Sequence, residues 1–368
     1  MVTPKCFFFG KCGGCNCQHI DYQTQIEDKR DKIRKIISFN NVELFHCNDY
    51  NYRNRMDFIF HKNGLGLRKK GQWNKIINID RCEIADEKIN SILSELQNNF
   101  SNIDYFDINT NKGTYKYAMV RVTEKQSAIS FTLNKDSMKL EQAIGEIKEF
   151  AKNSIADNII ISYVNLKEDS STSSDYFIVK GSDELTTTIL DNKFSFNVQG
   201  FFQNNLEVTQ KMHNYVNEIV KDFSLKNMGL LDLYGGVGTF GIINSGHFDS
   251  VTIMENSNEC IDSANKNIFL NNVGNATAIV KDAKNLKPKD YEGPLFVITD
   301  PPRSGMHPMT ISSLNKISPK YMIYVSCNPT QLAKDIKKFK KYKIGKAAVF
   351  DMFPQTNHIE VVVFLIKD

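Results

Sequence analysis

The second half of the chain alternates apolar runs with stretches of helical spacing, and this alternation limits the fold more than any other feature. Seven apolar runs follow residue 227, at 229–234, 250–255, 277–282, 295–300, 321–326, 347–352 and 359–366. Continuous apolar strands separated by helices predict a parallel sheet that is covered on both faces. Only a short connection joins the last two runs, so we expect them to form an antiparallel hairpin. The expected fold is an α/β sandwich with its ligand at the carboxyl edge of the strands.

The first half has a different pattern. Short alternating or β-branched runs predict strands at 56–60, 75–79, 117–123 and 127–133. A helix is expected at 22–38, where Ile26, Ile33, Ile36 and Ile37 share one face. Because 368 residues exceed one comfortable core, we expect two domains. We place them at 1–192 and 193–368.

Charge is spread unevenly along the chain. The net charge of +4, from 46 basic and 42 acidic residues, is too small to indicate nucleic-acid binding by itself. Basic clusters occur at 29–35, at Arg53 and Arg55, at 68–70 and at 334–346. One such cluster is often only a solvated surface, but several together predict a surface that faces RNA or DNA.

No apolar run approaches the roughly 20 residues that span a bilayer. The first residues contain an apolar core of only three residues, far shorter than that of a signal peptide. We therefore expect a soluble, cytoplasmic protein without a membrane partner. In that compartment the eight cysteines are expected to bind metal or to react rather than to form disulfides.

A glycine-rich turn, DLYGGVGTF at 232–240, follows the first apolar run and opens a helix. The next run ends in Glu255, where a carboxylate can accept hydrogen bonds from a ribose diol, and the third ends in Asp282. The turn lacks G-x-G-x-x-G, because Phe240 stands where the last glycine would be. S-adenosylmethionine, which has no phosphates, therefore fits better than NAD. The alternative is that Glu255 and Asp282 only cap helices.

The fourth run leads into Asp300-Pro301-Pro302-Arg303. Consecutive prolines stiffen the turn and fix Asp300 at the carboxyl edge. In methyltransferases that act on amino groups, an aromatic residue usually follows this motif and stacks on the target. Arg303 stands there instead, so an amine target is disfavoured.

Cys327 ends the fifth run, and Asn328-Pro329 begin a helix. The positive end of a helix dipole lowers the pKa of a thiol, so we expect Cys327 to be a nucleophile with a lowered pKa. The last strand starts at the same edge of the sheet, which predicts that Glu360 lies close to Cys327. His358 is expected nearby, either as a hydrogen-bonding support or as a general base.

A nucleophile, a methyl donor and a base suggest one reaction. Carbon 5 of uracil becomes nucleophilic when a thiolate adds to carbon 6, and a base must later remove the carbon-5 proton so that the cysteine is expelled. Enzymes that methylate carbon 5 of cytosine in RNA commonly carry a cysteine beside the proline of the fourth-run motif. Pro301-Pro302 have no such neighbour, so uracil is favoured.

Five motifs together resemble the S-adenosylmethionine-dependent RNA 5-methyluridine methyltransferases: FFQNN at 201–205, DLYGGVGTF, DPPRSG, YVSCNP and DMFPQTNHIE. The resemblance implies a Rossmann-like class I methyltransferase sandwich with a reversed last strand. A β-rich α+β domain carrying an iron–sulfur loop would precede it. Cys327 would be the nucleophile and Glu360 the proton acceptor. The residues that would line the methyl-donor site are Gln203, Tyr234, Glu255, Asp282 and Asp300.

One residue departs from the family pattern. Gly235 stands where relatives usually have a cysteine between Tyr234 and Gly236. A more pliable loop would weaken cofactor binding there. The chemistry is not affected, because that cysteine is not the nucleophile.

Cys6, Cys12 and Cys15 form the pattern C-x5-C-x2-C, with Cys82 or Cys17 as the fourth ligand. Spacing alone leaves zinc, an iron–sulfur cluster and reduced thiols open. The resemblance implies a [4Fe–4S] cluster held by Cys6, Cys12, Cys15 and Cys82. Since methyl transfer moves no electrons, we expect the cluster to pin the N-terminal loop to the β-rich domain and to shape an RNA-binding surface.

The substrate is expected to be RNA. Many relatives carry a small β-barrel module before the cluster cysteines, whereas Cys6 lies almost at the start here. This compactness is most similar to the branch that methylates 23S ribosomal RNA. The alternative is a transfer-RNA T-loop uridine, and no motif separates the two. No obligate protein partner is inferred.

Two alternatives come from other classes. A non-catalytic RNA-binding or redox iron–sulfur protein is disfavoured by the intact Cys327, Glu360 and Asp300. A small-molecule methyltransferase is disfavoured by the basic clusters and by the large first domain.

Overall fold

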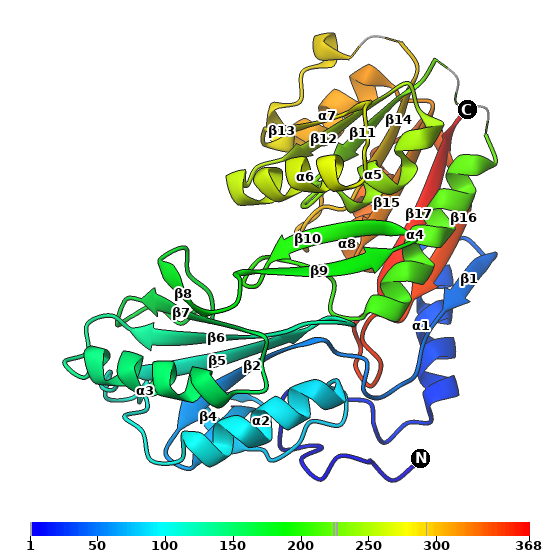
Figure 1. Ribbon diagram of the computed structural model, residues 1–368. Helices are drawn as coiled ribbons and strands as arrows, with labels where there is room; N and C mark the ends of the chain where they lie inside the picture. Colours follow the sequence, from blue (N-terminus) through cyan, green and yellow to red (C-terminus); the bar gives the residue numbers. More distant parts are fainter. Residues whose placement is uncertain (1, 224, 226, 292) are drawn as a thin grey trace.

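The computed structural model describes residues 2–223, 225, 227–291 and 293–368, and in these residues the chain forms two sheets and a connecting hairpin (Figure 1). The larger sheet has the strand order β1-β16-β17-β15-β14-β11-β12-β13. Its strands are β1 (Val42–Phe45), β11 (Gly229–Leu233), β12 (Ser250–Glu255), β13 (Ala276–Val280), β14 (Leu295–Thr299), β15 (Tyr321–Ser326), β16 (Tyr342–Phe350) and β17 (Glu360–Lys367).

All seven expected C-terminal runs are strands of this sheet. Strand β17 lies antiparallel to both β15 and β16, while the other neighbours are parallel. The predicted α/β sandwich and its reversed last strand are therefore confirmed. The chain order reverses between β11 and β14, which is where open α/β sheets bind their ligands.

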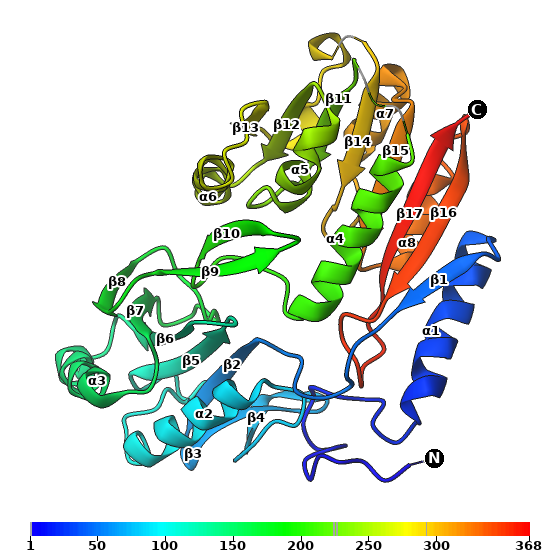
Figure 2. The same ribbon diagram turned by 45° about the vertical axis from the view of Figure 1, so that its right-hand side comes forward.

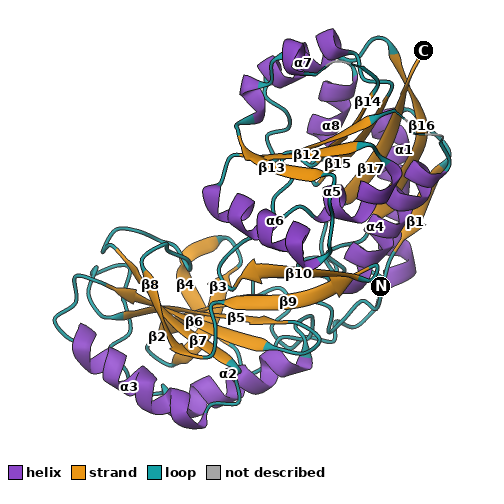
Figure 3. Cartoon of the chain, turned by 45° about the horizontal axis from the view of Figure 1, so that its top comes forward, coloured by secondary structure: helices purple, strands orange, loops and turns teal. Residues whose placement is uncertain are grey.

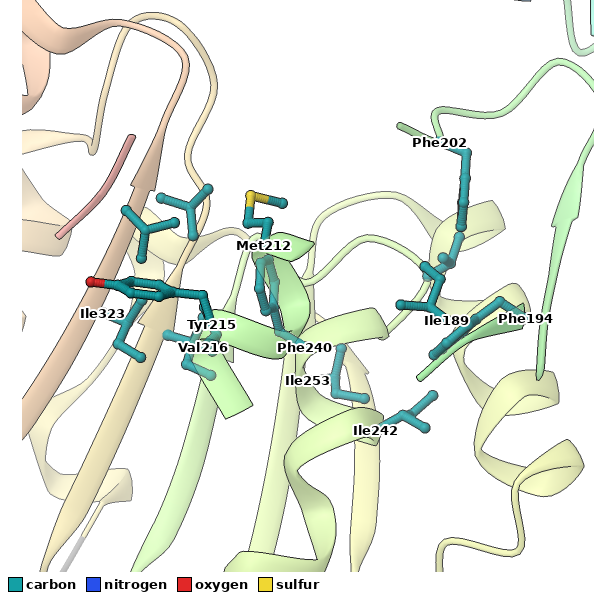
Figure 4. Close-up of a cluster of buried hydrophobic side chains, with 14 of the residues drawn as sticks. Ile189, Phe194, Phe202, Met212, Tyr215, Val216, Phe240, Ile242, Ile253 and Ile323 are labelled. Atoms are coloured by element: carbon teal, nitrogen blue, oxygen red, sulfur yellow. The ribbon is translucent and has the colours of Figure 1, made fainter. Parts of the chain in front are cut away.

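Helices cover both faces of the larger sheet. One core contains side chains from α4 (Leu206–Lys221) and α5 (Thr239–Asn244), with α6 (Asn258–Leu270) beside them. Figure 4 shows part of it, with Met212, Tyr215 and Val216 of α4 near Phe240 and Ile323. The opposite core contains side chains from α1 (Tyr22–Ile37), α7 (Pro308–Ile317) and α8 (Pro329–Ile336). Short 3-10 helices occur at Ser245–His247, Ala283–Asn285 and Pro288–Asp290.

Helix α1 confirms the helix expected at 22–38, but its packing partner was not expected. Strand β1 pairs in parallel with β16, from Val42 opposite Ala347 to Phe45 opposite Phe350. The rings of Phe45 and Phe350 stack with centroids 4.8 Å apart. Residues 22–45 therefore pack with the C-terminal sheet, although the division at 192/193 places them in the first domain. The open edge of β16 supplies the partner that the short strand β1 needs. For the rest of the chain the division stays a prediction.

The smaller sheet forms the β-rich domain, in the order β4-β3-β2-β5-β6-β7-β8. Its strands are β2 (Arg55–His61), β3 (Gly64–Lys69), β4 (Gln72–Asn78), β5 (Tyr115–Val122), β6 (Ser127–Asn134), β7 (Asn158–Val164) and β8 (Tyr176–Lys180). Helices α2 (Glu87–Asn99) and α3 (Leu140–Asn153) cover one face (Figure 3). The expected strands and the α+β character of this half are confirmed.

A hairpin of β9 (Glu184–Ile189) and β10 (Asn192–Asn197) connects the two sheets (Figure 2). Phe196 of the hairpin stacks on Phe202 with centroids 4.1 Å apart. Asn54 of the β-rich domain donates from its backbone to the Asn204 carbonyl at 3.0 Å, and from its side chain to the Gln203 carbonyl at 3.2 Å. The FFQNN motif therefore lies where the two domains meet.

Candidate active site

Cys327 and Glu360 reach the same site from adjacent strands. Cys327 follows β15 directly, and Asn328 caps α8 by accepting a hydrogen bond from the Gln331 backbone at 3.3 Å. Glu360 is the buried first residue of β17. Asp300 follows β14, and the charges of Asp300 and Glu360 both act on the Cys327 thiol. The structure thus brings together the three residues that the topology predicts at this edge.

The pKa of Cys327 differs from the expectation. Burial raises the pKa of the thiol, and the negative charges of Glu360 and Asp300 raise it further. Arg303 opposes this through a hydrogen bond and its positive charge, but it does not reverse the shift. The prediction of a lowered pKa is wrong, because it considered the helix dipole and neither the burial of the thiol nor the two neighbouring carboxylates. The resting thiol is therefore protonated at neutral pH.

Glu360 and Asp300 form a carboxyl pair. Burial raises the pKa of both groups, and the charge of Asp300 raises that of Glu360 again, while Arg303 lowers it. Two carboxylates that repel each other in a buried site retain a proton more readily than either would alone. A raised pKa makes the ionised form of Glu360 a stronger proton acceptor than an exposed glutamate, and it also lowers the fraction of Glu360 that is ionised at neutral pH.

Arg303 links the loop after β14 to His358 and to Asn328 beside Cys327. The sequence did not predict this role, since there Arg303 only disfavours an amine target. Its Nη2 lies 3.0 Å from Nδ1 of His358, and its carbonyl accepts a hydrogen bond from the Asn328 side chain at 2.9 Å. Burial and the positive charges of Arg303, Lys29 and Arg53 lower the pKa of His358. The geometry favours the reading of His358 as a hydrogen-bonding support, because a neutral imidazole accepts from the guanidinium.

The loop between β16 and β17, residues 351–359, is held by the N-terminal segment. Lys29 and Asp351 form a buried ion pair at 2.7 Å, and the Tyr22 hydroxyl donates to the same carboxylate at 3.0 Å. The Gln25 side chain donates to the Gln355 side chain at 3.0 Å. Lys29 lies three residues after Ile26 and four before Ile33, both buried. A lysine on the apolar face of a helix was the available signal for this contact.

The glycine turn forms a strained, braced cradle at the carboxyl end of β11. Tyr234, Gly236 and Gly238 have φ values of 59°, 53° and 88°. Glu255 accepts from the backbone of Gly236 at 3.2 Å and from that of Asn256 at 2.7 Å. Glu255 also accepts from the Ser257 backbone at 3.2 Å. Because a carboxylate has about four lone pairs that can accept, these three hydrogen bonds leave one for a ligand.

Two other predicted donor-site residues have partners within the chain. Asp282 accepts from the backbone of Lys284 at 2.9 Å and pairs with the Lys284 ammonium at 3.0 Å. The Tyr234 hydroxyl is directed toward Thr310 and the His307 backbone at the start of α7, and burial raises its pKa.

Asp232 is a buried carboxylate behind the turn that sequence reasoning did not select. It accepts from the Gly241 backbone at 2.9 Å, and its other oxygen, Oδ1, is buried without a hydrogen-bond partner among the described residues. Burial raises its pKa to about 7. The unpartnered oxygen is compatible with a polar ligand in the cradle.

Gly235 is tightly packed rather than loose. A Cβ atom at this position would lie 2.6 Å from Cγ2 of Ile253 and 3.2 Å from Cγ of Asp232. The expectation of a more pliable loop is therefore not met, because the Ile253 side chain fills the space that a cysteine would need.

Cys6, Cys12, Cys15 and Cys82 line one cavity of about 370 Å³. Cys17 lies elsewhere: it is buried, and its Sγ donates to the Asn357 side chain at 2.8 Å. Burial raises the pKa of Cys15 to about 12 and that of Cys82 to about 11. Within the described ranges, no three Cys, His, Asp or Glu side chains converge as they would around one metal ion. The four thiols therefore share one cavity without being gathered around a single point.

No helix in the described part of the chain combines the length and the apolar character needed to cross a bilayer.

Comparisons with known proteins agree with this geometry. The tRNA (uracil-5-)-methyltransferase family matches residues 21–287 and 283–368. An uncharacterized RNA methyltransferase of Caldanaerobacter subterraneus is 30% identical over 100% of this chain and 85% of the relative. The tRNA (uracil(54)-C(5))-methyltransferase of Pyrococcus abyssi is 30% identical over 99% of this chain and 86% of the relative.

A crystal structure of the Pyrococcus abyssi enzyme in complex with S-adenosyl-L-homocysteine is also similar. It has a TM-score of 0.82 and 28% identity, over 97% of this chain and 86% of that chain. The match extends through both sheets, and the chain belongs to the S-adenosylmethionine-dependent RNA (uracil-5-)-methyltransferase family.

Proposed function

We propose that this chain methylates carbon 5 of a uridine in transfer RNA, through a covalent bond between Cys327 and carbon 6 of the uracil. The observation that carries the proposal is the meeting of Cys327, Glu360 and Arg303 at the carboxyl edge of the sheet. A thiol, a buried carboxyl and a guanidinium at one point suit addition to a pyrimidine followed by proton removal.

The first step needs a thiolate. Cys327 loses its proton to solvent, and the guanidinium of Arg303, which acts to lower the pKa of the thiol, stabilises the anion. The sulfur then adds to carbon 6, and the electrons of the 5,6 double bond move onto carbon 5 and the carbonyl at carbon 4. Carbon 5 is now an enolate carbon and can attack a methyl group.

S-adenosylmethionine, when bound, supplies the methyl group on a sulfonium sulfur, which leaves as the neutral thioether. Glu360 then removes the proton from carbon 5 of the methylated ring. The electrons of that carbon–hydrogen bond re-form the double bond and expel the Cys327 thiolate from carbon 6. Arg303 holds His358 beside this centre, and the buried position of Glu360 keeps competing water away.

The donor site is proposed to consist of Gln203, Tyr234, Glu255, Asp282 and Asp300. Glu255 supports this proposal with its remaining lone pair at the end of β12. Asp300 lies beside the reacting residues and would join the donor site to the nucleophile.

The choice of transfer RNA rests on relatives. The Pyrococcus proteins that resemble this chain over nearly its whole length are named for uracil 54 of tRNA. No comparison supports the expectation of 23S ribosomal RNA, so we favour its alternative, the T-loop uridine.

The experiment is methylation of unmodified transcripts with labelled S-adenosylmethionine. A tRNA transcript, the same transcript with cytidine at the T-loop target, and 23S fragments are compared, and nuclease digests are mapped by mass spectrometry. We expect 5-methyluridine in the first RNA only. Methylation of a 23S fragment in preference to tRNA would contradict the choice of substrate, and methylation by Cys327→Ala would contradict the mechanism.

We also propose that Cys6, Cys12, Cys15 and Cys82 hold a [4Fe–4S] cluster with a structural role. Their shared cavity supports this assignment. Anaerobic reconstitution should give visible absorbance and about four iron atoms per chain, and Cys17→Ser should leave both unchanged. Stoichiometric zinc instead of iron would overturn the assignment.

A further inference from the structure

The β3–β4 hairpin presents an exposed tryptophan in a basic segment. Trp73 is the only tryptophan in the chain, and 64% of it is exposed. Residues 61–78 contain five lysines and arginines and no acidic residue. This segment includes the basic cluster 68–70, which takes no part in the proposed reaction.

Trp73 lines a cavity of about 320 Å³ between the hairpin and the segments 105–111 and 166–169. This volume lies within the range of about 300–1,000 Å³ that is typical of ligand pockets. Phe106, whose ring carries the Lys116 ammonium 4.3 Å from its centroid, and the buried Tyr117 also line the cavity, and Asn74 and Asn109 provide amide groups. Aromatic faces combined with amides are the groups that recognise unpaired bases in RNA.

The pocket wall is held rigidly from within the domain. Arg68 pairs with Asp169 at 2.8 Å and hydrogen-bonds the Tyr117 hydroxyl at 2.8 Å. Lys116 donates to the carbonyls of Asn165 and Leu166 at 3.0 and 3.1 Å. These two cations are thus occupied by the protein itself.

The remaining basic residues face solvent. Lys62, Lys69, Lys70 and Lys75 are exposed, and none of them forms a salt bridge with any residue that the structure describes. Lys62 lines the pocket, together with the carboxylates of Asp107, Glu168 and Asp169, whereas Lys69, Lys70 and Lys75 lie along the hairpin that carries Trp73. Exposed lysines on such a hairpin match the phosphates that flank a base.

The pocket is connected to the cysteine loop and, through it, to the reaction centre. The backbone N–H of Gly13 donates to the Arg68 carbonyl at 3.1 Å, and the backbone N–H of Lys70 donates to the Lys11 carbonyl at 2.8 Å. Arg68 and Tyr117 line both this pocket and the cysteine cavity. Arg53, on the other side of the cysteine cavity, acts electrostatically on His358.

We propose that this pocket binds an unpaired base of the substrate RNA other than the target uridine. The base stacks on Trp73 while Lys62 at the pocket, and Lys69, Lys70 and Lys75 further along the hairpin, contact neighbouring phosphates. The inference rests on the proposed function only in taking RNA as the substrate. It gives the β3–β4 hairpin a role in binding that RNA at a point distant from the reaction centre.

The test is equilibrium binding of the tRNA transcript to the full chain, which does not depend on turnover. RNA should quench the fluorescence of the single tryptophan. Filter binding should show that Trp73→Ala raises Kd about 5- to 150-fold, the range expected for loss of one stacking contact. Trp73→Phe should retain most of the affinity, and kcat at saturating RNA should change less than about twofold.

Phe269→Ala is the matched control, because Phe269 is also an exposed aromatic residue, at 82%, but lies on α6. Unquenched fluorescence with saturating RNA, or an unchanged Kd for Trp73→Ala, would overturn the proposal. Quenching by free nucleotides but not by RNA would also overturn it and would indicate a small-molecule site. The Cys327→Ala protein should still show the quenching, so loss of methylation alone does not affect this inference.

Discussion

The proposed nucleophile, Cys327, and the proposed base, Glu360, are positioned in opposite ways. Cys327 is fixed by residues that are near it in sequence: Asn328 caps the following helix and reaches the Arg303 carbonyl at 2.9 Å. Glu360 follows a loop whose anchors, Tyr22, Gln25 and Lys29, lie more than 320 positions away. The nucleophile is therefore built locally, whereas the base depends on the N-terminal segment being docked.

This difference has a thermodynamic consequence. Lys29 and Asp351 are both buried, and removing one member of a buried ion pair leaves an uncompensated charge. A substitution that breaks the contacts of the N-terminal segment should therefore displace Glu360 and His358, whereas Cys327 should keep its position.

The largest expected effect comes from Glu360→Gln, which removes the base and keeps the shape. Turnover should fall at least about 100-fold, as for loss of a general base. Because Cys327 is unaffected, a covalent and already methylated RNA–protein species should accumulate. Denaturing gels and mass spectrometry detect it. Free methylated RNA at the normal rate would contradict the role of Glu360.

Lys29→Met tests the long-range side of the comparison. It should lower the free energy of unfolding by about 3–5 kcal/mol, because Asp351 is left buried without its partner. Chemical denaturation measures this change. The double variant Lys29→Met/Asp351→Leu should recover most of the stability, since no charge remains unpaired.

Gly235→Ala tests the packing of the glycine turn against the neighbouring strand β12. The new Cβ would contact Ile253 at 2.6 Å, so stability should fall by about 1–3 kcal/mol, and affinity for S-adenosylhomocysteine should fall with it. Ile253→Ala in the same chain removes the contacting Cγ2 and should restore part of the affinity, as measured by calorimetry, while thermal unfolding follows the stability of both variants. No loss from Gly235→Ala would show that the turn is looser than its packing indicates.

The smallest expected effect is on pH dependence. The folded-state pKa of Cys327 is raised, so the thiolate fraction at neutral pH is small and grows as pH rises through that pKa. The single-turnover rate of adduct formation should therefore increase from neutral to alkaline pH. Arg303→Met should move this rise to higher pH, because the group that lowers the pKa is lost. A rate that is flat above neutral pH would contradict the raised pKa.

Sequence reasoning succeeded where local patterns carry the information. The apolar runs predicted every strand of the C-terminal sheet except β1, and the reversed β17 predicted that Glu360 would meet Cys327. It missed β1, because VELF at 42–45 is too short to stand out and is stabilised only by β16. It gave the wrong sign for the Cys327 pKa because that sign depends first on the burial of the thiol and then on the charges of Glu360 and Asp300.

Other features depend on packing that no local pattern reveals. The role of Arg303 requires His358, which lies 55 residues further along the chain. The fit of Gly235 requires Ile253 on the neighbouring strand. The cysteine spacing could not choose between Cys17 and Cys82, and the shared cavity of Cys82 with Cys6, Cys12 and Cys15 favours Cys82.

Intact-mass and peptide analysis of the complex with RNA containing 5-fluorouridine at the target, formed with S-adenosylmethionine, tests the central claim most directly. Fluorine at carbon 5 cannot be removed as a proton, so the adduct cannot break down. We predict one RNA and one methyl group per chain, with the RNA attached to the peptide that contains Cys327. An equal yield of adduct from Cys327→Ala, or attachment at another cysteine, would contradict the account.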